Sequence, residues 1–322
     1  MTATHHVPAP RFIQLYREDS TAIRQELIAG LTARPAHTSP KHLYDALGSR
    51  LFEAITELPE YYPTRTEAAI FAGNAGEMAN HVTSGATLVD LGAGNCAKAA
   101  RLFEVLRPAR YVAVDISVEF LGNALASLQR QHPALEMIGV GMDFSSSLAL
   151  PPEVGAGPRT LFYPGSSIGN FTPAEALAFL RQAQAACNGG SLIIGVDLVK
   201  EKAIVEPAYD DPLQVTAAFN RNMLLHINTL VGSDFQLGDW SHRAFFNQRD
   251  SRIEMHLVTH DAVTVRWPAG ERAFAAGETI HTENSYKWRV ADFAGLLEEA
   301  GFRQPRHWQD ERGWFAVFVA QA

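Results

Sequence analysis

The fold is decided by one stretch of the sequence, Val89-Asp90-Leu91-Gly92-Ala93-Gly94-Asn95, which joins a short apolar run to a helical pattern. Glycines at such a strand-to-helix turn let the backbone come close to a ligand. Asp115 ends the next apolar run, where an acidic side chain is placed to accept both ribose hydroxyls of an adenosine. Asp143-Phe144 ends the third run and adds a carboxylate and a ring. Together these strand ends predict one ligand site along a single edge of a sheet.

The region around this stretch, from about Thr64 to Lys200, alternates short β-branched or apolar runs with helical periodicities. Such alternation is typical of a parallel sheet that is covered by helices. We predict five parallel strands, at Thr87–Leu91, Arg110–Val114, Glu136–Gly141, Thr160–Tyr163 and Ser191–Leu198.

Two segments between these strands carry helix signals. After the glycine turn, Leu102, Val105 and Leu106 mark one apolar helical face. Further along, Thr172-Pro173-Ala174-Glu175 combines a capping box with proline at the first helical position, and Asn188-Gly189-Gly190 supplies a stop. We therefore predict a helix in each segment.

The rhythm changes beyond Lys200, which indicates a second domain. A helix is predicted at Pro212–Leu230, followed by strand-like alternation at Arg252–Leu257, Ala262–Trp267 and Thr279–Trp288. The first pattern then resumes with a further helix and a closing strand at Trp314–Ala320. We predict an α/β protein with a doubly wound, mainly parallel sheet and a second, discontinuous α+β domain. The predicted boundaries are 64–200 plus 288–322 for the sheet domain, and 1–63 plus 201–287 for the second domain.

Composition and charge narrow the range of partners. Lys and Arg number 27 against 35 Asp and Glu, and the net charge of −8 argues against nucleic acid. The cysteines, Cys96 and Cys187, are too few for a disulfide framework and fit a reducing cytosol. Apolar stretches such as Leu192–Val199 fall short of the roughly 18 residues of a membrane span, and Met1–Pro10 lacks the pattern of an export signal. We expect a cytoplasmic monomer without membrane partners. The twelve histidines contain no His-Glu-x-x-His motif, and no metal is predicted.

The glycine turn allows two interpretations. Gly92-x-Gly94-x-x-Ala97 satisfies the relaxed dinucleotide fingerprint, but Asp90 would repel a pyrophosphate and suits a ligand that bears an ammonium and a sulfonium. Three features together resemble the class I S-adenosylmethionine-dependent methyltransferases. They are the Asp-x-Gly-x-Gly motif, the acidic residue that ends the second strand, and the Asp-Phe pair after the third strand. This resemblance implies S-adenosylmethionine as methyl donor and S-adenosylhomocysteine as product. The implied contacts are Asp90, Gly92, Gly94, Lys98, Asp115, Asp143 and Phe144.

Each of these cofactor residues also has an ordinary structural interpretation. The glycines would only shape a tight turn, Asp115 and Asp143 would cap helices, and Lys98 would face water. The cofactor interpretation depends on all of them occurring together at successive strand ends.

The loop after the fourth predicted strand, Tyr163–Asn170, lies where this fold presents its acceptor-side residue. Methyl transfer from a sulfonium is an in-line displacement, so the protein must mainly align the donor with a free lone pair. The loop lacks the Asn/Asp-Pro-Pro-aromatic motif of nucleic-acid amino methyltransferases. Asn170 would accept a hydrogen bond from an amine without the full charge that holds it as ammonium. Alternatively, Asn170 caps the helix that begins near Pro173, or closes a turn.

Longer blocks of the sequence resemble the histidine-specific Nα-methyltransferases of ergothioneine biosynthesis. The resemblance spans about Leu43 to Ala320 and implies trimethylation of the α-amino group of L-histidine to hercynine, with three molecules of S-adenosylmethionine consumed. The blocks are Leu43–Ser49, Leu58–Glu67, Gly165–Asn170, Ala218–Asn222 and Thr282–Lys287.

The family resemblance also implies residue roles. Tyr44 lies beside the amine, either as a proton relay or only as a positioning group, and Asn170 holds the amine. Tyr61 and Tyr209 bind the substrate carboxylate. Glu283 and Ser285 hold the imidazole, and Met255 lines the pocket.

The strand pattern supports the imidazole assignment independently. Alternate strand residues share a face, so Glu283 and Ser285 point the same way. A carboxylate and a hydroxyl satisfy both imidazole nitrogens, whereas an indole has one N–H and leaves a polar group unpaired.

Alternatives stay open for the substrate residues as well. Glu283 is also interpretable as a solvated charge paired with Lys287, Met255 as a core residue, and the tyrosines as domain-interface aromatics. Related fungal enzymes of the family methylate a prenylated tryptophan, so a tryptophan-like or other small amine is the alternative substrate. A nonenzymatic S-adenosylmethionine-binding protein is the alternative from another class.

Overall fold

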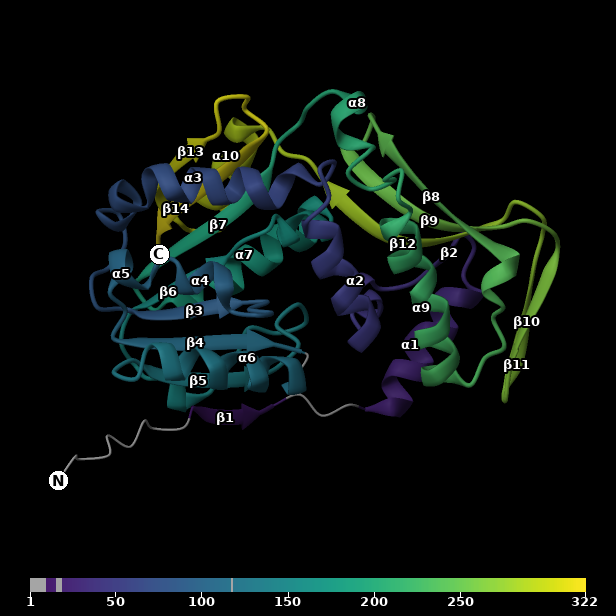
Figure 1. The fold of residues 1–322 in the computed structure, drawn as a ribbon, viewed down its shortest axis with the longest axis horizontal. Helices are drawn as coiled ribbons and strands as arrows, with labels where there is room; N and C mark the ends of the chain where they lie inside the picture. Colours follow the sequence, from purple (N-terminus) through teal and green to yellow (C-terminus); the bar gives the residue numbers. More distant parts are fainter. Residues whose placement is uncertain (1–9, 16–18, 117) are drawn as a thin grey trace.

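The computed structural model describes residues 10–15, 19–116 and 118–322, so most of the Met1–Pro10 segment lies outside the described residues. An eight-stranded sheet forms the centre of one lobe (Figure 1), in the order β1-β5-β4-β3-β6-β7-β14-β13. Its strands are β1 (Arg11–Gln14), β3 (Thr87–Leu91), β4 (Arg110–Asp115), β5 (Glu136–Gly141), β6 (Arg159–Tyr163), β7 (Ser191–Asp197), β13 (Arg303–Gln309) and β14 (Phe315–Gln321).

The strand directions make this sheet doubly wound. The six strands from β1 to β7 in the sheet order run parallel, and β14 runs antiparallel to both β7 and β13. The order reverses between β3 and β6, and in such sheets ligands bind in the crevice outside the carboxyl ends at this point. The five predicted parallel strands and the fold expected from the resemblance to class I methyltransferases are confirmed.

The N-terminal arm departs from the predicted domain division. The predicted assignment of residues 1–63 to the second domain is wrong for Arg11–Gln14, which pairs in parallel with Ile138–Gly141 of β5. The short strand covers an edge that would otherwise expose unpaired backbone groups. Gly139 permits the contact, since a Cβ there would lie 2.5 Å from the Phe12 ring. The remaining domain boundaries stay a prediction.

Helices cover both faces of the large sheet. On one face, α7 (Pro173–Cys187) and α10 (Val290–Glu299) pack on the strands, and on the other lie α3 (Tyr62–Ala79), α4 (Ala97–Ala100), α5 (Phe103–Leu106) and α6 (Val118–Gln131). The capping box of α7 is confirmed, because the Thr172 backbone N–H donates to Glu175 Oε2 at 2.8 Å and the Glu175 backbone N–H donates to Thr172 Oγ1 at 3.3 Å.

The helix predicted after the glycine turn is split in two. The short helices α4 and α5 are separated at Arg101 and Leu102, and Val105, expected on the apolar face, is 39% exposed. Leu102 and Leu106 are buried as expected. Because the helix is interrupted between two four-residue segments, the apolar positions follow no single helical face.

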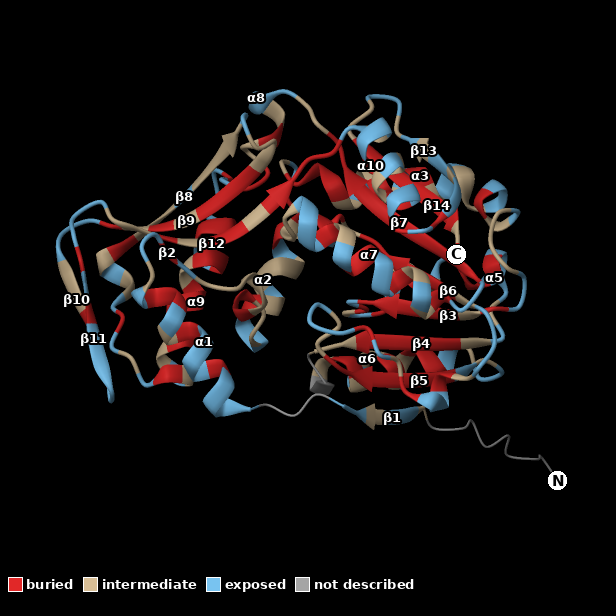
Figure 2. Ribbon diagram, turned by 180° about the vertical axis from the view of Figure 1, so that it is seen from behind, coloured by how far each residue is buried: buried red, intermediate tan, exposed pale blue. Residues whose placement is uncertain are grey.

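The second lobe has its own hydrophobic core and a four-stranded sheet in the order β2-β12-β9-β8 (Figures 1 and 2). Its strands, with the separate hairpin β10-β11, are β2 (Ala36–His37), β8 (Trp240–Asn247), β9 (Arg252–Thr259), β10 (Val263–Trp267), β11 (Gly270–Phe274) and β12 (Thr279–Tyr286). Its helices are α1 (Ser20–Thr32), α2 (Ala46–Thr56), α8 (Lys202–Val205) and α9 (Val215–Val231). Over both lobes, the described residues also form four 3-10 helices: η1 (Pro40–Leu43), η2 (Pro152–Val154), η3 (Ser167–Asn170) and η4 (Leu237–Asp239).

Two local features complete the description. The pairing of β12 with β9 shifts register between His281 and Glu283, so Thr282 is an extra residue in the strand. Among the helices that the structure describes, none has the length and apolar character needed to cross a bilayer.

Candidate active site

Two neighbouring cavities lie between the lobes. The large cavity, of about 1170 Å³, follows the carboxyl ends of β3 to β6 and extends into the second lobe, and the small cavity, of about 50 Å³, adjoins it. All the predicted cofactor residues line the large cavity: Asp90, Gly92, Gly94, Lys98, Asp115, Asp143 and Phe144. All the predicted substrate residues line the small cavity: Tyr44, Tyr61, Asn170, Tyr209, Met255, Glu283 and Ser285. Tyr44, Tyr61, Asn170 and Glu283 belong to both linings, so the two predicted sites share a wall.

The glycine turn faces open space. Gly92 and Gly94 adopt φ angles of +72° and +51°, a conformation that favours glycine. A Cβ at Gly94 would meet no atom within 4 Å, which leaves room for a ligand at the turn. The Gly94 backbone N–H donates to Asp115 Oδ2 at 3.0 Å, so the turn also orients the carboxylate that ends β4.

Asp90 is a buried carboxyl at the floor of the large cavity. It is 2% exposed, and its Oδ2 atom accepts a hydrogen bond from the Tyr111 hydroxyl at 2.7 Å. Burial raises the pKa of Asp90 to about 7, although the Tyr111 hydrogen bond opposes the rise. A cationic ligand would stabilise the ionised form of this carboxyl, which agrees with a sulfonium and disfavours a pyrophosphate.

Three further predicted cofactor residues lie elsewhere along the large cavity: Asp143 and Phe144 follow β5, and Lys98 lies in α4 after the glycine turn. Asp143 accepts a hydrogen bond from the Ser145 backbone N–H at 3.1 Å, while the Phe144 ring packs edge-on against Tyr163. Lys98 does not simply face water, because its Nζ atom lies 2.7 Å from Glu67 Oε2.

Glu67 is a buried residue of this site that the sequence analysis missed. It is 1% exposed, and its Oε1 atom accepts the Gly165 backbone N–H at 2.7 Å while Oε2 pairs with Lys98. The carboxylate therefore ties the loop after β6 to the helix after the glycine turn. The sequence does carry one sign that Glu67 is buried. It lies at helical spacing from the apolar residues Pro63 and Ile70, which are buried on the same face of α3.

Asn170 is the last residue of η3, and its side chain is available to a ligand in the cavities. The alternative that it caps α7 is wrong, because the N-cap is Thr172. Its side chain forms no hydrogen bond with any residue that the structure describes, and it lines both cavities. The loop reaches β12, since a Cβ at Gly169 would lie 2.9 Å from the Tyr286 carbonyl oxygen. This packing places Asn170 beside the strand that carries Glu283.

Aromatic rings form much of the shared wall. Tyr44 packs edge-on against Phe52 and Phe219, with ring centroids 5.6 and 5.5 Å apart, and Tyr61 packs against Tyr209 at 6.2 Å. Burial raises the pKa of the Tyr44 hydroxyl well above its ordinary value, and the charge of Glu283 adds to the rise. Tyr44 is therefore a neutral phenol near neutral pH. Its hydroxyl offers the cavity one hydrogen and its lone pairs.

Glu283 is a buried carboxyl that lines both cavities. It is 9% exposed, and its carboxylate accepts no hydrogen bond from the described part of the chain. Burial raises its pKa to about 7, opposed by the positive charge of Lys287. The alternative of a solvated charge paired with Lys287 is wrong, because the Lys287 Nζ atom lies 2.7 Å from Asp197 Oδ2. Met255, opposite Glu283 in the sheet, belongs to both the core and the small cavity.

A cluster of potential metal ligands lies elsewhere in the second lobe. Glu254, His256 and His281 hold their ligand atoms within 4.8 Å of one another. The Glu254 carboxylate lies 2.7 Å from Arg252 Nη2 and is thus already neutralised. The expectation of no metal stays a prediction.

Comparison with known proteins agrees with this geometry. A family model described as "Histidine-specific methyltransferase, SAM-dependent" matches residues 23–322. The "Histidine N-alpha-methyltransferase" of Mycolicibacterium smegmatis is 42% identical over 93% of this chain and 94% of that protein, and the one from Mycobacterium tuberculosis is 39% identical with the same coverage. "Ergothioneine biosynthesis protein 1" of Neurospora crassa is 31% identical over 83% of this chain and 31% of that protein. The chain belongs to the histidine-specific, S-adenosylmethionine-dependent methyltransferases.

Proposed function

We propose that the protein transfers three methyl groups from S-adenosylmethionine to the α-amino group of L-histidine, giving hercynine, the first step of ergothioneine biosynthesis. The observation that carries the proposal is the buried carboxylate of Glu283, which accepts no hydrogen bond from the described residues and lies in a small cavity that shares Asn170 with the large one. A carboxylate in this state is available to accept a hydrogen bond from an N–H group of a ligand. The names of the mycobacterial relatives support histidine as that ligand.

The donor side fits S-adenosylmethionine, which supplies an electrophilic methyl group on a positively charged sulfur. Asp115 is oriented by the Gly94 backbone N–H and would accept the ribose hydroxyls. Asp143 and Phe144 would flank the adenine, and Lys98 would reach the cofactor carboxylate from its place beside Glu67. The raised pKa of Asp90 indicates a carboxyl that gains most from a nearby cation.

The acceptor side must hold an amine with a free lone pair in line with the donor methyl group. The neutral amide of Asn170 accepts a hydrogen bond from the amine without fixing it as ammonium. Tyr44 lies on the same shared wall, where its neutral hydroxyl positions the amine. The third methyl group turns the amine into a permanent cation, and the faces of Tyr44 and Tyr61 tolerate a quaternary ammonium.

Two polar residues of the small cavity select the side chain of the substrate. Glu283 and Ser285 lie two residues apart on one face of β12, and both line this cavity. An imidazole satisfies both groups, whereas an indole leaves one of them buried without a partner. We therefore favour histidine over a tryptophan-like amine.

Mass spectrometry of the reaction products tests the proposed function. The purified protein with S-adenosylmethionine and histidine is expected to yield mono-, di- and trimethylated histidine in succession. A panel of other free amino acids, tryptophan included, serves as the control and is expected to react at least about 100-fold more slowly. A preference for tryptophan would overturn the substrate assignment. Cofactor binding without any methylated amine would instead support the nonenzymatic alternative.

A further inference from the structure

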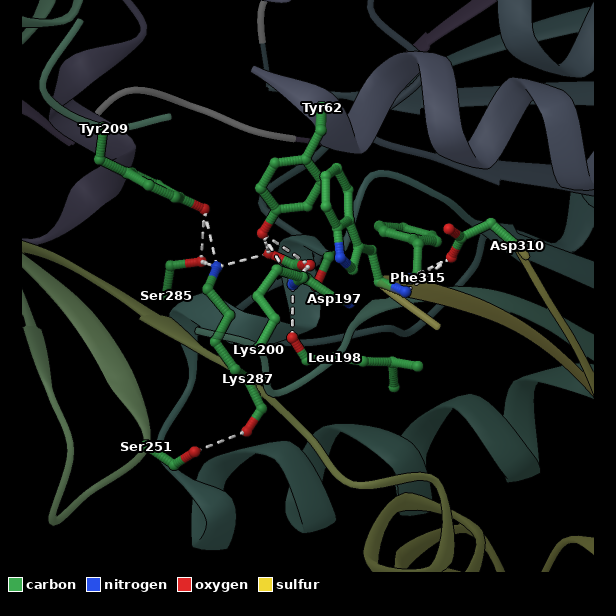
Figure 3. A network of polar contacts seen from close by, with 12 residues as sticks. Tyr62, Asp197, Leu198, Lys200, Tyr209, Ser251, Ser285, Lys287, Asp310 and Phe315 are labelled. Carbon is green, nitrogen blue, oxygen red and sulfur yellow. Dashed lines mark hydrogen bonds and ion pairs between the residues drawn. The ribbon is translucent and has the colours of Figure 1, made fainter. Parts of the chain in front are cut away.

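Lys287 follows β12 directly, at the junction between the two lobes, and its side chain is fully buried. Its Nζ atom lies 2.7 Å from Asp197 Oδ2, 2.7 Å from Ser285 Oγ and 3.0 Å from the Tyr209 hydroxyl (Figure 3). An ammonium group has three hydrogens to donate. All three are engaged within the protein, so Lys287 acts on a ligand only through its neighbours.

Asp197 fixes the position of this ammonium group. It ends β7, is 1% exposed and also accepts hydrogen bonds from the Tyr62 hydroxyl at 2.8 Å and from Lys200 (Figure 3). Burial raises the pKa of Asp197, but the charges of Lys287 and Lys200 outweigh it and hold the pKa below its ordinary value. The carboxylate therefore stays ionised and anchors Lys287 between the lobes.

The two hydroxyls held by Lys287 also contact each other. Ser285 Oγ and the Tyr209 hydroxyl oxygen lie 2.8 Å apart, and each accepts a hydrogen bond from Lys287. Each hydroxyl has one hydrogen and two lone pairs. One of the two hydroxyls donates its hydrogen to the other. The accepting hydroxyl then has both lone pairs occupied and only its own hydrogen free, whereas the donating hydroxyl has only one lone pair free. The pair thus offers the small cavity one donor and one acceptor.

We propose that Lys287 is a positioning residue for substrate selection, which fixes Tyr209 as donor to the substrate carboxylate and Ser285 as acceptor of a ring N–H. This inference rests on the proposed function and deepens it. When Tyr209 donates to a carboxylate, Ser285 must donate to Tyr209 and keeps a lone pair for the ring. Glu283 then shares one proton with the other ring nitrogen. Among the aromatic amino-acid side chains, only the imidazole of histidine has two ring nitrogens and so satisfies both positions.

The test compares Lys287→Met with Lys200→Met as the matched control. Both variants remove one ammonium group from Asp197, but Lys200 contacts neither Ser285 nor Tyr209. We expect Lys287→Met to raise the KM for histidine by roughly tenfold to a hundredfold, with kcat and S-adenosylhomocysteine affinity much less affected. Lys200→Met is expected to change this KM by less than about threefold. Equal KM increases in the two variants would show that only the Asp197 pairing matters and would overturn the proposal.

A double-mutant cycle with Ser285→Ala tests whether Lys287 acts through the hydroxyl. The double variant Ser285→Ala/Lys287→Met is expected to raise KM no more than the more severe single variant does. Independent effects that multiply would contradict the proposal. If Lys287→Met does not fold, Lys287→Gln, which removes the charge and leaves Asp197 paired with Lys200, takes its place. Turnover of histidine by the unsubstituted protein in the same assay reports on the proposed function separately.

Discussion

Replacing Glu283 with alanine is expected to raise the KM for histidine by about 10- to 150-fold, because the substrate ring loses a hydrogen bond to a charged group, worth about 1.5–3 kcal/mol. The carboxylate has no partner in the described part of the chain, so its hydrogen-bonding capacity is directed to the ligand. Steady-state kinetics with varied histidine concentration measure this change. Binding of S-adenosylhomocysteine, followed by calorimetry, is expected to stay within about twofold of its original affinity.

Glu283→Gln separates the charge of this residue from its shape. The amide keeps an acceptor oxygen and the volume of the side chain. The KM of Glu283→Gln for histidine is therefore expected to lie between the KM of the unsubstituted protein and that of Glu283→Ala. Since burial of Glu283 raises its pKa to about 7, the ionised group costs the fold stability. Neither variant is therefore expected to lower the melting temperature. A KM for Glu283→Ala within twofold of the original would refute the imidazole assignment.

Replacing Asn170 with alanine is expected to lower kcat by about 100-fold, because small misplacements of reacting groups cost this much. The side chain has no hydrogen-bond partner among the described residues, so its loss leaves no protein group unpaired. Asn170→Asp is the sharper variant, since a full negative charge stabilises the substrate as ammonium and removes its lone pair. Single-turnover rates with saturating histidine and S-adenosylmethionine measure both effects.

Thr172→Ala is the matched control for Asn170. Thr172 lies two residues further along the same loop and caps α7, so its loss costs about 0.5–2 kcal/mol of stability. It lines the large cavity but not the small one. It is expected to lower the melting temperature and leave kcat unchanged. A similar loss of kcat in Thr172→Ala and Asn170→Ala would mean that the loop conformation, and not the amide, is responsible. An Asn170→Asp variant with full activity would rule out the role of a neutral acceptor.

Elements with strong local signals were predictable from the sequence. The five parallel strands are continuous apolar runs because both faces of the sheet are covered by helices. The start of α7 follows from a capping box that uses only neighbouring residues. By contrast, β1 pairs with β5 more than a hundred residues away, and only the tertiary structure reveals that edge. The split between α4 and α5 has no glycine or proline to mark it.

The candidate site shows the same division between local and distant information. Glu283 and Ser285 share a face of β12 as the alternation predicts. The bulge at Thr282 does not disturb this, because both residues follow it and pair regularly with Met255 and Ile253. Lys287 also follows the alternation in the sequence, which suggested a pair with Glu283. However, β12 ends at Tyr286, and Lys287 turns toward Asp197 at the end of β7 in the other lobe. Contacts across the lobes leave no periodic trace in the sequence.

A crystal structure with S-adenosylhomocysteine and histidine bound together tests the central claim most directly, namely that donor and acceptor meet at the shared wall of the two cavities. The account predicts the nucleoside along the ends of β3 to β5, with its ribose on Asp115 and its sulfur facing the histidine amine beside Asn170. It also predicts the imidazole between Glu283 and Ser285. A nucleoside bound away from the large cavity, or an imidazole outside the small one, would contradict the account.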